Sequence, residues 1–406
     1  MRTVLCFAVL VMTMVSNSRV LAADDKTKPA ADAINAFAID LYKQVAATSD
    51  GNAFFSPSSV SAALAMTSLG AKGQTQQEML AVLKFGGGDA ASAEPVHAAY
   101  AELMKLTAGS GGDHGYQLSM ANRLWGQQGF HFMPAFLDAT QKYYGAPLET
   151  VNFADTEAAR AAINKWVDGQ TAHKISELLK PGVLSGRTTL VLTNAVYFKG
   201  TWASQFKKEQ TKNEAFHVSP GTDVNVSMMH QSHKFAYAED DAAQVLAMPY
   251  GNGDLSMVVM LPNKVDGLGD LERKLSGEWV AGVLGKLKAR QAIVALPRFH
   301  MGGSIELSKV LSAMGMPLAF EMGKADFSGM TTQEKLAIDK VVHEAVVTVD
   351  EEGTEAAAAT AVTMKRMAAK IGEEPVIFRA DHPFVFVIRD NRSGAILFMG
   401  KVVRPA

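Results

Sequence analysis

The residue best placed for acid-base chemistry is a histidine inside a strongly apolar segment. His343 lies in the run VVHEAVVTV at residues 341–349, where alternate residues share one face of a strand. An imidazole on such a face is either a general base or a core side chain satisfied by hydrogen bonds. The apolar neighbours favour the second interpretation. We therefore expect His343 to have a structural role.

No catalytic motif accompanies this histidine. The chain lacks Gly-x-Ser-x-Gly, His-Glu-x-x-His and a phosphate loop, and Gly251-Asn252-Gly253 is a turn. The single cysteine, Cys6, falls in a predicted leader, which excludes disulfides, a thiol nucleophile and cysteine-ligated metal from the mature chain. A triad built from scattered Ser and His residues stays open. We predict a protein that is not an enzyme and that needs no cofactor or metal.

The overall composition excludes several partners. The chain has 406 residues, 48% of them hydrophobic, with a net charge of −2. This composition predicts a large folded core and gives no field to attract nucleic acid. The first 22 residues, with Arg2 ahead of an apolar stretch at 4–15, are typical of a signal peptide, and that stretch is too short to span a bilayer. We expect export to an extracellular or periplasmic compartment, no membrane partner, and one domain over residues 23–406.

An alanine-rich segment directly follows the strand that carries His343. Residues 351–364 read EEGTEAAAATAVTM, with no proline before Pro375. A short helix and a flexible linker are two possible structures for it, since alanine has the best helix propensity. Neither explains the alternation well, because the uncharged set at 354, 356, 358, 360 and 362 lies on one side and Glu355 on the other. Such a segment also fits between two strands of a sheet.

The elements around this segment suggest an α+β fold. Apolar periodicity predicts helices over residues 34–45 and 59–69, and Asp155 is a candidate N-cap for another. Nearly continuous β-formers predict strands over 188–198 and 255–261, and 384–388 with 396–403 form a hairpin pattern. Helices dominate early and strands late, without regular alternation. This order favours α+β over a doubly wound sheet.

At this point the sequence resembles the serpin family over essentially the whole mature chain. Besides the alanine-rich segment, several long motifs occur in the family's order. They are NAFFSP at 52–57, LGAKG at 69–73, TNAVYFKGTW at 193–202, ADFSGM at 325–330, HPF at 382–384 and FMGKV at 398–402.

The resemblance implies a serpin fold with three β-sheets, about nine helices and an exposed reactive-centre loop at about 353–375. It also implies an inhibitor of serine proteases that acts as a suicide substrate: the protease is trapped as an acyl-enzyme when the cleaved loop inserts into the main sheet. The hinge of that loop would consist of Glu351, Gly353, Thr354, Glu355, Ala356, Ala357, Ala358, Ala359 and Thr360. A polar cluster where the sheet parts, the shutter, would consist of Ser56, Ser59, Asn194 and His343. The breach, at the top of the sheet, would pair Glu351 with Arg298 near Trp202.

The family register places the reactive bond between Met367 and Ala368, fourteen residues beyond the hinge glycine. Met367 suits chymotrypsin-, elastase- or subtilisin-like proteases. The preceding Arg366 leaves open a bond between Arg366 and Met367 and a trypsin-like target. The partner would be a serine protease in a covalent complex with a monomeric inhibitor. A serpin that does not inhibit, serving as a carrier or chaperone, is the remaining alternative, but the small hinge residues favour inhibition.

Overall fold

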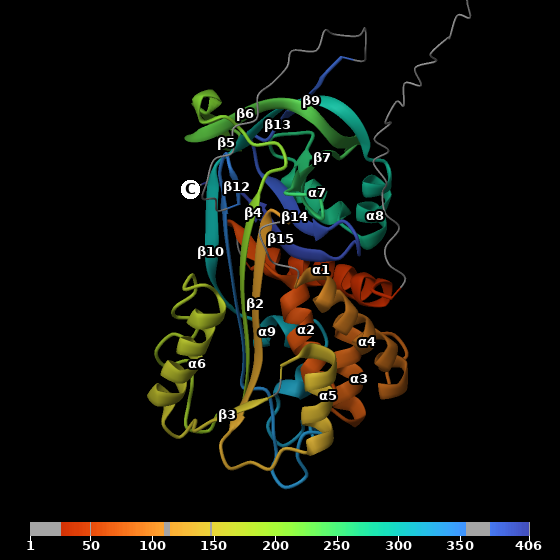
Figure 1. Ribbon diagram of the computed structural model, residues 1–406, viewed down its shortest axis with the longest axis vertical. Coiled ribbons are helices and arrows are strands. Elements are labelled where there is room, and N and C mark those ends of the chain that lie inside the picture. Colours follow the sequence, from red (N-terminus) through yellow and green to blue (C-terminus); the bar gives the residue numbers. More distant parts are fainter. Residues whose placement is uncertain (1–25, 49, 109–113, 147, 355–373, 406) are drawn as a thin grey trace, which may run out of the picture.

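The computed structural model describes residues 26–48, 50–108, 114–146, 148–354 and 374–405, and one of its two sheets, which contains β2, β4 and β10, extends along the long axis of the molecule (Figure 1). The helices are α1 (Lys28–Ala47), α2 (Pro57–Ser68), α3 (Gly73–Val82), α4 (Ala90–Thr107), α5 (Pro134–Tyr144), α6 (Thr156–Gln170), α7 (Leu268–Lys274), α8 (Gly277–Gly285) and α9 (Ser308–Ala313), with 3-10 turns η1 (Lys208–Gln210) and η2 (Pro317–Phe320). The predicted α+β class is confirmed.

One sheet has six strands in the order β10-β11-β12-β4-β2-β3. These strands are β10 (Phe299–Glu306), β11 (Lys340–Val349), β12 (Gly353–Thr354), β4 (Leu190–Thr201), β2 (Tyr116–Gln127) and β3 (Glu149–Val151). β4 is one of the two strands expected from the β-former runs, and β11 is the strand expected to carry His343. In β11, alternate residues from Val341 to Val349, including His343, are at most 1% exposed, so the predicted inward face is confirmed.

The other sheet has nine strands in the order β1-β15-β14-β8-β7-β6-β9-β13, with β5 also paired to β6. These strands are β1 (Ala53–Phe55), β5 (Lys212–Ser219), β6 (Thr222–Glu239), β7 (Ala243–Tyr250), β8 (Leu255–Pro262), β9 (Lys288–Pro297), β13 (Val376–Arg379), β14 (Phe384–Asp390) and β15 (Ile396–Val402). The 18-residue β6 pairs with β9 over most of its length and with β7 only near its end. The resemblance implied three sheets. The described residues form two, because the long strand β6 is continuous with both parts of the nine-stranded sheet.

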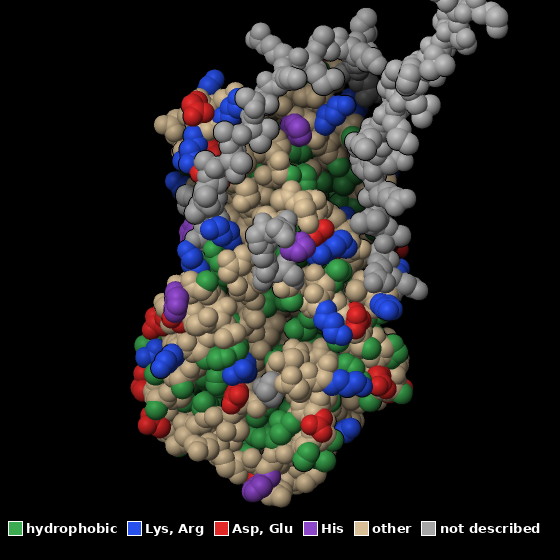
Figure 2. Space-filling view, in the orientation of Figure 1, with side chains coloured by type: hydrophobic (Ala, Val, Ile, Leu, Met, Phe, Trp, Pro, Cys, Tyr) green, Lys and Arg blue, Asp and Glu red, His purple; other side chains and the backbone are tan. Residues whose placement is uncertain are grey.

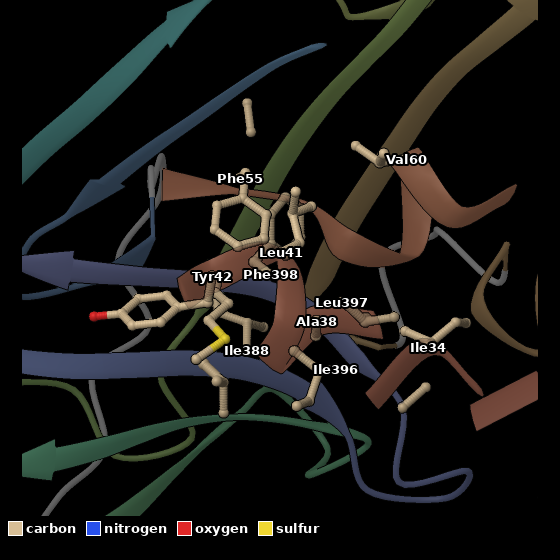
Figure 3. Close-up of a cluster of buried hydrophobic side chains, with 14 of the residues drawn as sticks. Ile34, Ala38, Leu41, Tyr42, Phe55, Val60, Ile388, Ile396, Leu397 and Phe398 are labelled. Carbon is tan, nitrogen blue, oxygen red and sulfur yellow. The ribbon is translucent and has the colours of Figure 1, made fainter. Parts of the chain in front are cut away.

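The main core lies between the helices at the N-terminal end of the chain and both sheets. Figure 3 shows Phe55, Ile388 and Phe398 packed against side chains of α1 and α2. Tyr42, from α1, points its hydroxyl out of this cluster and donates a hydrogen bond of 2.8 Å to Glu272 Oε1. The α1 helix predicted over residues 34–45 thus forms because its apolar face is buried by strands distant in sequence.

A smaller core lies under α6, on the opposite face of the six-stranded sheet (Figure 1). Ile163 and Val167 of α6 are fully buried there with Val191 and Ala195 of β4. Asp155 Oδ1 accepts a hydrogen bond of 3.1 Å from the Ala158 amide, so the predicted N-cap is confirmed. The part of β4 that contains Val191 and Ala195 therefore has α6 on one face of the sheet and the main core on the other.

The surface carries mixed charge. Acidic and basic side chains are interspersed over the face shown in Figure 2, as the net charge of −2 suggests. No helix within the described ranges has the length and apolar character needed to cross a membrane.

Candidate functional site

The six-stranded sheet is parted at one end. β11 and β4 are direct parallel neighbours over seven register pairs, from Lys340 with Val191 to Val346 with Tyr197. Beyond that point the two strands separate, and the two-residue strand β12 lies between them, antiparallel to both. The beginning of the predicted hinge therefore already occupies the slot between the two central strands.

Hinge residues Gly353 and Thr354 are fixed firmly in this slot. The Thr354 side chain is fully buried, and its Oγ1 lies 2.8 Å from the Tyr250 hydroxyl. Gly353 has φ of +153°, and a Cβ built there would lie 1.9 Å from the Gly200 carbonyl oxygen. Only glycine fits such a close approach between backbones. The Asp350 carboxylate closes the preceding turn by accepting hydrogen bonds from the backbone N–H groups of Glu352 and Gly353.

The breach pair predicted from the sequence is present beside the slot. Arg298 Nε donates to both carboxylate oxygens of Glu351 at 2.8 Å, and Arg298 Nη2 and the Thr211 hydroxyl also donate to Oε1. The Glu351 side chain is 2% exposed, whereas Arg298 is 44% exposed. Burial raises the pKa of Glu351, but the hydrogen bonds from Arg298 and Thr211 outweigh it and hold this pKa below its ordinary value. The carboxylate therefore stays ionised.

Trp202 connects the breach to the hinge turn. Its indole Nε1 donates a hydrogen bond of 2.9 Å to the Asp350 carbonyl oxygen, and its ring stacks on Tyr250 with centroids 4.4 Å apart. The Trp202 amide donates to the Glu352 carbonyl at 2.9 Å. Trp202 does not touch the ion pair itself through any hydrogen bond among the described residues, so it acts on the turn and through Tyr250 on Thr354.

Farther down the sheet, a row of buried polar side chains crosses three strands. Asn122 of β2, Asn194 of β4 and His343 of β11 are register partners in that order. Ser59 Oγ donates to Asn122 Oδ1 at 2.5 Å, and the Ser56 amide donates to His343 Nε2 at 2.9 Å. All four predicted shutter residues thus lie together, with Asn122 as a fifth that the sequence analysis missed.

The middle of this polar row is unsatisfied. Both amide atoms of Asn194 and Nδ1 of His343 are buried without a hydrogen-bond partner among the described residues. Because His343 Nε2 accepts, its ring proton is assigned to Nδ1. Burial lowers the pKa of His343 to about 3, and the Asn194 backbone, which lies near the imidazole without the geometry of a full hydrogen bond, offsets this only in part. The imidazole is therefore neutral at physiological pH, which supports a structural role.

The far end of the predicted loop is anchored on another sheet. β13 begins at Val376 and pairs in parallel with β9 over four residues. Arg379 binds Glu214 Oε2 through Nη2 and Asp381 Oδ2 through Nε, each at 2.6 Å, and His230 Nε2 lies 2.9 Å from Glu214 Oε1. This ion chain fastens the end of β13 to β5 and β6.

Some predicted residues cannot be placed. The hinge positions 355–360 and the candidate reactive bonds at 366–368 lie outside the described residues. The sequence analysis also missed Thr211 and Tyr250, which contact the hinge. A pattern that pointed to Asn122 was available, because it interrupts the apolar alternation of Leu118, Met120 and Leu124.

Comparison with known proteins gives one consistent result. Residues 32–405 match the family described as serpin (serine protease inhibitor). Serpin B4 of Homo sapiens is 41% identical over 385 residues, covering 91% of this chain and 97% of that protein. Leukocyte elastase inhibitor A of Rattus norvegicus is 42% identical over 381 residues, with the same two coverages.

Solved structures agree with the sequence matches. A serpin described as highly specific, from the insect Tenebrio molitor, superimposes with a TM-score of 0.82 at 33% identity, covering 94% of this chain and 99% of that one. Uncleaved ovalbumin also gives a TM-score of 0.82, at 31% identity, with coverages of 92% and 99%. The described architecture is therefore that of these proteins.

Proposed function

The chain belongs to the serpin family, and we propose that it inhibits serine proteases as a suicide substrate. A protease attacks the loop that begins at Gly353 and forms an acyl-enzyme. The freed loop then inserts between β11 and β4 before the ester is hydrolysed. The attached protease is carried along and distorted.

The observation that carries this proposal is the position of β12 between β11 and β4. Thr354 already opposes Val349 on one side and Gly200 on the other, in antiparallel register. Each further residue that enters would advance this register by one position. Six residues on, Thr360 would lie between His343 and Asn194, which are each other's partners in the present sheet.

The same register decides which inserted side chains face the core. Directly opposed residues of neighbouring strands point to the same face of a sheet. Residues 356, 358 and 362 would therefore lie beside Phe198, Val196 and Leu192, which are fully buried in the main core. These three loop residues are Ala, Ala and Val, so they can be buried without leaving a charge or an unpaired polar group.

Insertion also explains how deacylation would fail. Fourteen inserted residues at ~3.3 Å each form a strand on the order of 45 Å long, so the protease would travel tens of Å. Displacing catalytic groups by even ~1 Å costs roughly 100-fold in rate. The energy for this comes from new ladder hydrogen bonds and buried side chains, which makes the uncut form a kinetic trap.

We propose Met367 as the bait residue and a chymotrypsin-, elastase- or subtilisin-like enzyme as the target class. A named relative, leukocyte elastase inhibitor A, supports this class by its name. The bond after Arg366 and a trypsin-like target are the alternative outcome of the same experiment.

The test is incubation of the purified chain with chymotrypsin, elastase, subtilisin and trypsin, followed by denaturing gels and mass spectrometry. A stable complex is expected at the summed mass of the two proteins less the C-terminal fragment, together with a released peptide that starts at Ala368. A peptide starting at Met367 would move the bait to Arg366. Simple cleavage without a stable complex by every protease would favour a carrier or chaperone role.

We further propose that the protein is exported and acts as a monomer outside the cytoplasm. The predicted leader lies outside the described residues, and α1 begins a few residues after it, at Lys28. Expression of the full chain followed by N-terminal sequencing of the exported product should find a start after Ala22 or Ala23. Retention of the intact N-terminus in the cytoplasm would contradict export.

A further inference from the structure

Two exposed isoleucines stand side by side next to the end of the reactive loop. Only four large hydrophobic residues are exposed across the described ranges, and two of them, Ile293 at 46% and Ile377 at 67%, are register partners on β9 and β13. Neighbouring strands lie ~4.8 Å apart, so the two side chains form one continuous apolar surface. We call this pair the isoleucine patch.

The patch has a polar surround. Ser232 of β6 is the register partner of Ile293 on the other side, and its hydroxyl accepts a hydrogen bond of 3.0 Å from Gln291 Nε2. Two residues beyond Ile377, Arg379 is held in the ion chain with Glu214. An apolar centre with a satisfied polar rim is the usual anatomy of a protein interface.

The strand under the patch is also an edge. Among the described residues, β13 ends the nine-stranded sheet and pairs with β9 alone. Edge strands usually avoid exposed apolar side chains, because these favour association with other chains. Ile377 is instead the most exposed of the four large hydrophobic residues, which points to a partner that covers it.

The length of chain between the patch and the reactive bond identifies this partner. Ten steps of chain lead from Met367 to Ile377, which limits the distance between them to about 35 Å. A protease of ~230 residues has a radius of gyration of roughly 17 Å and is therefore about 45 Å across. A protease bound at Met367 thus extends over the base of the loop, where β9 and β13 lie at the upper end of the molecule (Figure 1).

We propose that the isoleucine patch is a docking site for the target protease, in addition to the loop itself. The inference rests on the proposed function, since it takes the loop's attacker as the partner. The patch contacts the protease surface beside its active site and selects proteases that present an apolar side chain there. It therefore contributes to target choice independently of the bait residue.

The test is equilibrium binding to inactive proteases, in which alanine replaces the active-site serine of each member of the panel. The double variant Ile293→Thr/Ile377→Thr keeps β-branched side chains and so preserves strand propensity. The matched control is Met322→Thr, which removes an equally exposed apolar side chain (54%) beyond η2, away from the loop. Thermal melting and sedimentation of the free variants accompany the binding measurement.

We expect the double variant to bind the best-bound protease about tenfold more weakly, and the control within twofold of the original chain. Unchanged binding of the double variant, or no binding by any inactive protease, would refute the proposal that the patch is a docking site. A change in self-association instead would assign the patch to a second copy of this chain. Covalent complex formation with the active enzymes is measured separately on denaturing gels. Binding that depends on the patch, without any covalent complex, would contradict suicide inhibition but would still support the docking site.

Discussion

Thr360→Val should weaken the inserted form of the protein while sparing the uncut form. Valine replaces the hydroxyl with a methyl group of similar size. In the uncut protein, Asn194 and His343 have buried amide and Nδ1 atoms without partners among the described residues. The β12 register would bring the Thr360 hydroxyl between them after cleavage.

The expected size of this effect follows from the number of hydrogen bonds. One hydroxyl can donate to Asn194 Oδ1 and accept from His343 Nδ1–H. A buried hydrogen bond of this kind contributes about 1 kcal/mol, so two contribute about 2 kcal/mol. If both form before the protease is released, insertion slows up to ~30-fold, since 1.4 kcal/mol is a factor of ten. More protease would then escape by hydrolysis.

The assay compares stoichiometry of inhibition and resistance to guanidinium before and after cleavage. Thr363→Val is the matched control. Residue 363 lies three positions beyond 360, and the same register would place it opposite Lys340 and Val191, away from the polar row. Thr360→Val should raise the stoichiometry and lower the stability of the cleaved form only. Equal effects of the two variants would refute the register argument.

Three further predictions concern the breach, the hinge and buried histidines. Glu351→Lys breaks the ion pair with Arg298, at a cost of about 2 kcal/mol because that arginine is partly exposed. Polymers should then appear on mild heating in native gels, and an unchanged polymer fraction would sink the idea. Gly353→Ala should increase the fraction of molecules that the protease cleaves without being trapped, because the new Cβ would lie 1.9 Å from the Gly200 carbonyl oxygen. An unchanged stoichiometry of inhibition would contradict this. Burial lowers the pKa of His97 to about 4 and that of His343 to about 3, from an ordinary 6.5. The unfolded chain therefore binds protons below pH 6.5 that the folded chain does not. Stability to urea should fall by about 4 kcal/mol from pH 7 to pH 5, and His97→Asn should remove about half of that slope.

Local patterns predicted the elements well. The helical periodicity of residues 34–45, the Asp155 cap and the β-former run of β4 each depend on neighbours within a few positions, and the structure has α1, α6 and β4 there. The alternation in the hinge is also local, and the buried Thr354 agrees with it.

Long-range partners were harder to predict. Thr211 and Tyr250 contact Glu351 and Thr354 across 140 and 104 residues, and nothing in their own segments distinguishes them from ordinary strand residues. Ile293 illustrates the opposite limit, because a β-branched residue in an apolar strand is normally buried. The side chain of Ile293 is nevertheless 46% exposed, because exposure depends on which face of the sheet the other elements cover, and only the assembled fold shows that.

The short strand β13 also limits what the uncut chain can do. If insertion reached Leu190, Met364 would lie at the bottom of β4, about 36 Å from Thr201 at eleven steps of ~3.3 Å. Twelve steps of chain, at most about 42 Å, would then have to return to Val376 at the upper end and cross to another sheet (Figure 1). The chain between Met364 and Val376 would therefore be fully extended before the inserted strand is complete. An intact molecule can therefore finish insertion only by peeling β13 and its ion chain away, whereas one peptide-bond cleavage removes the tether altogether.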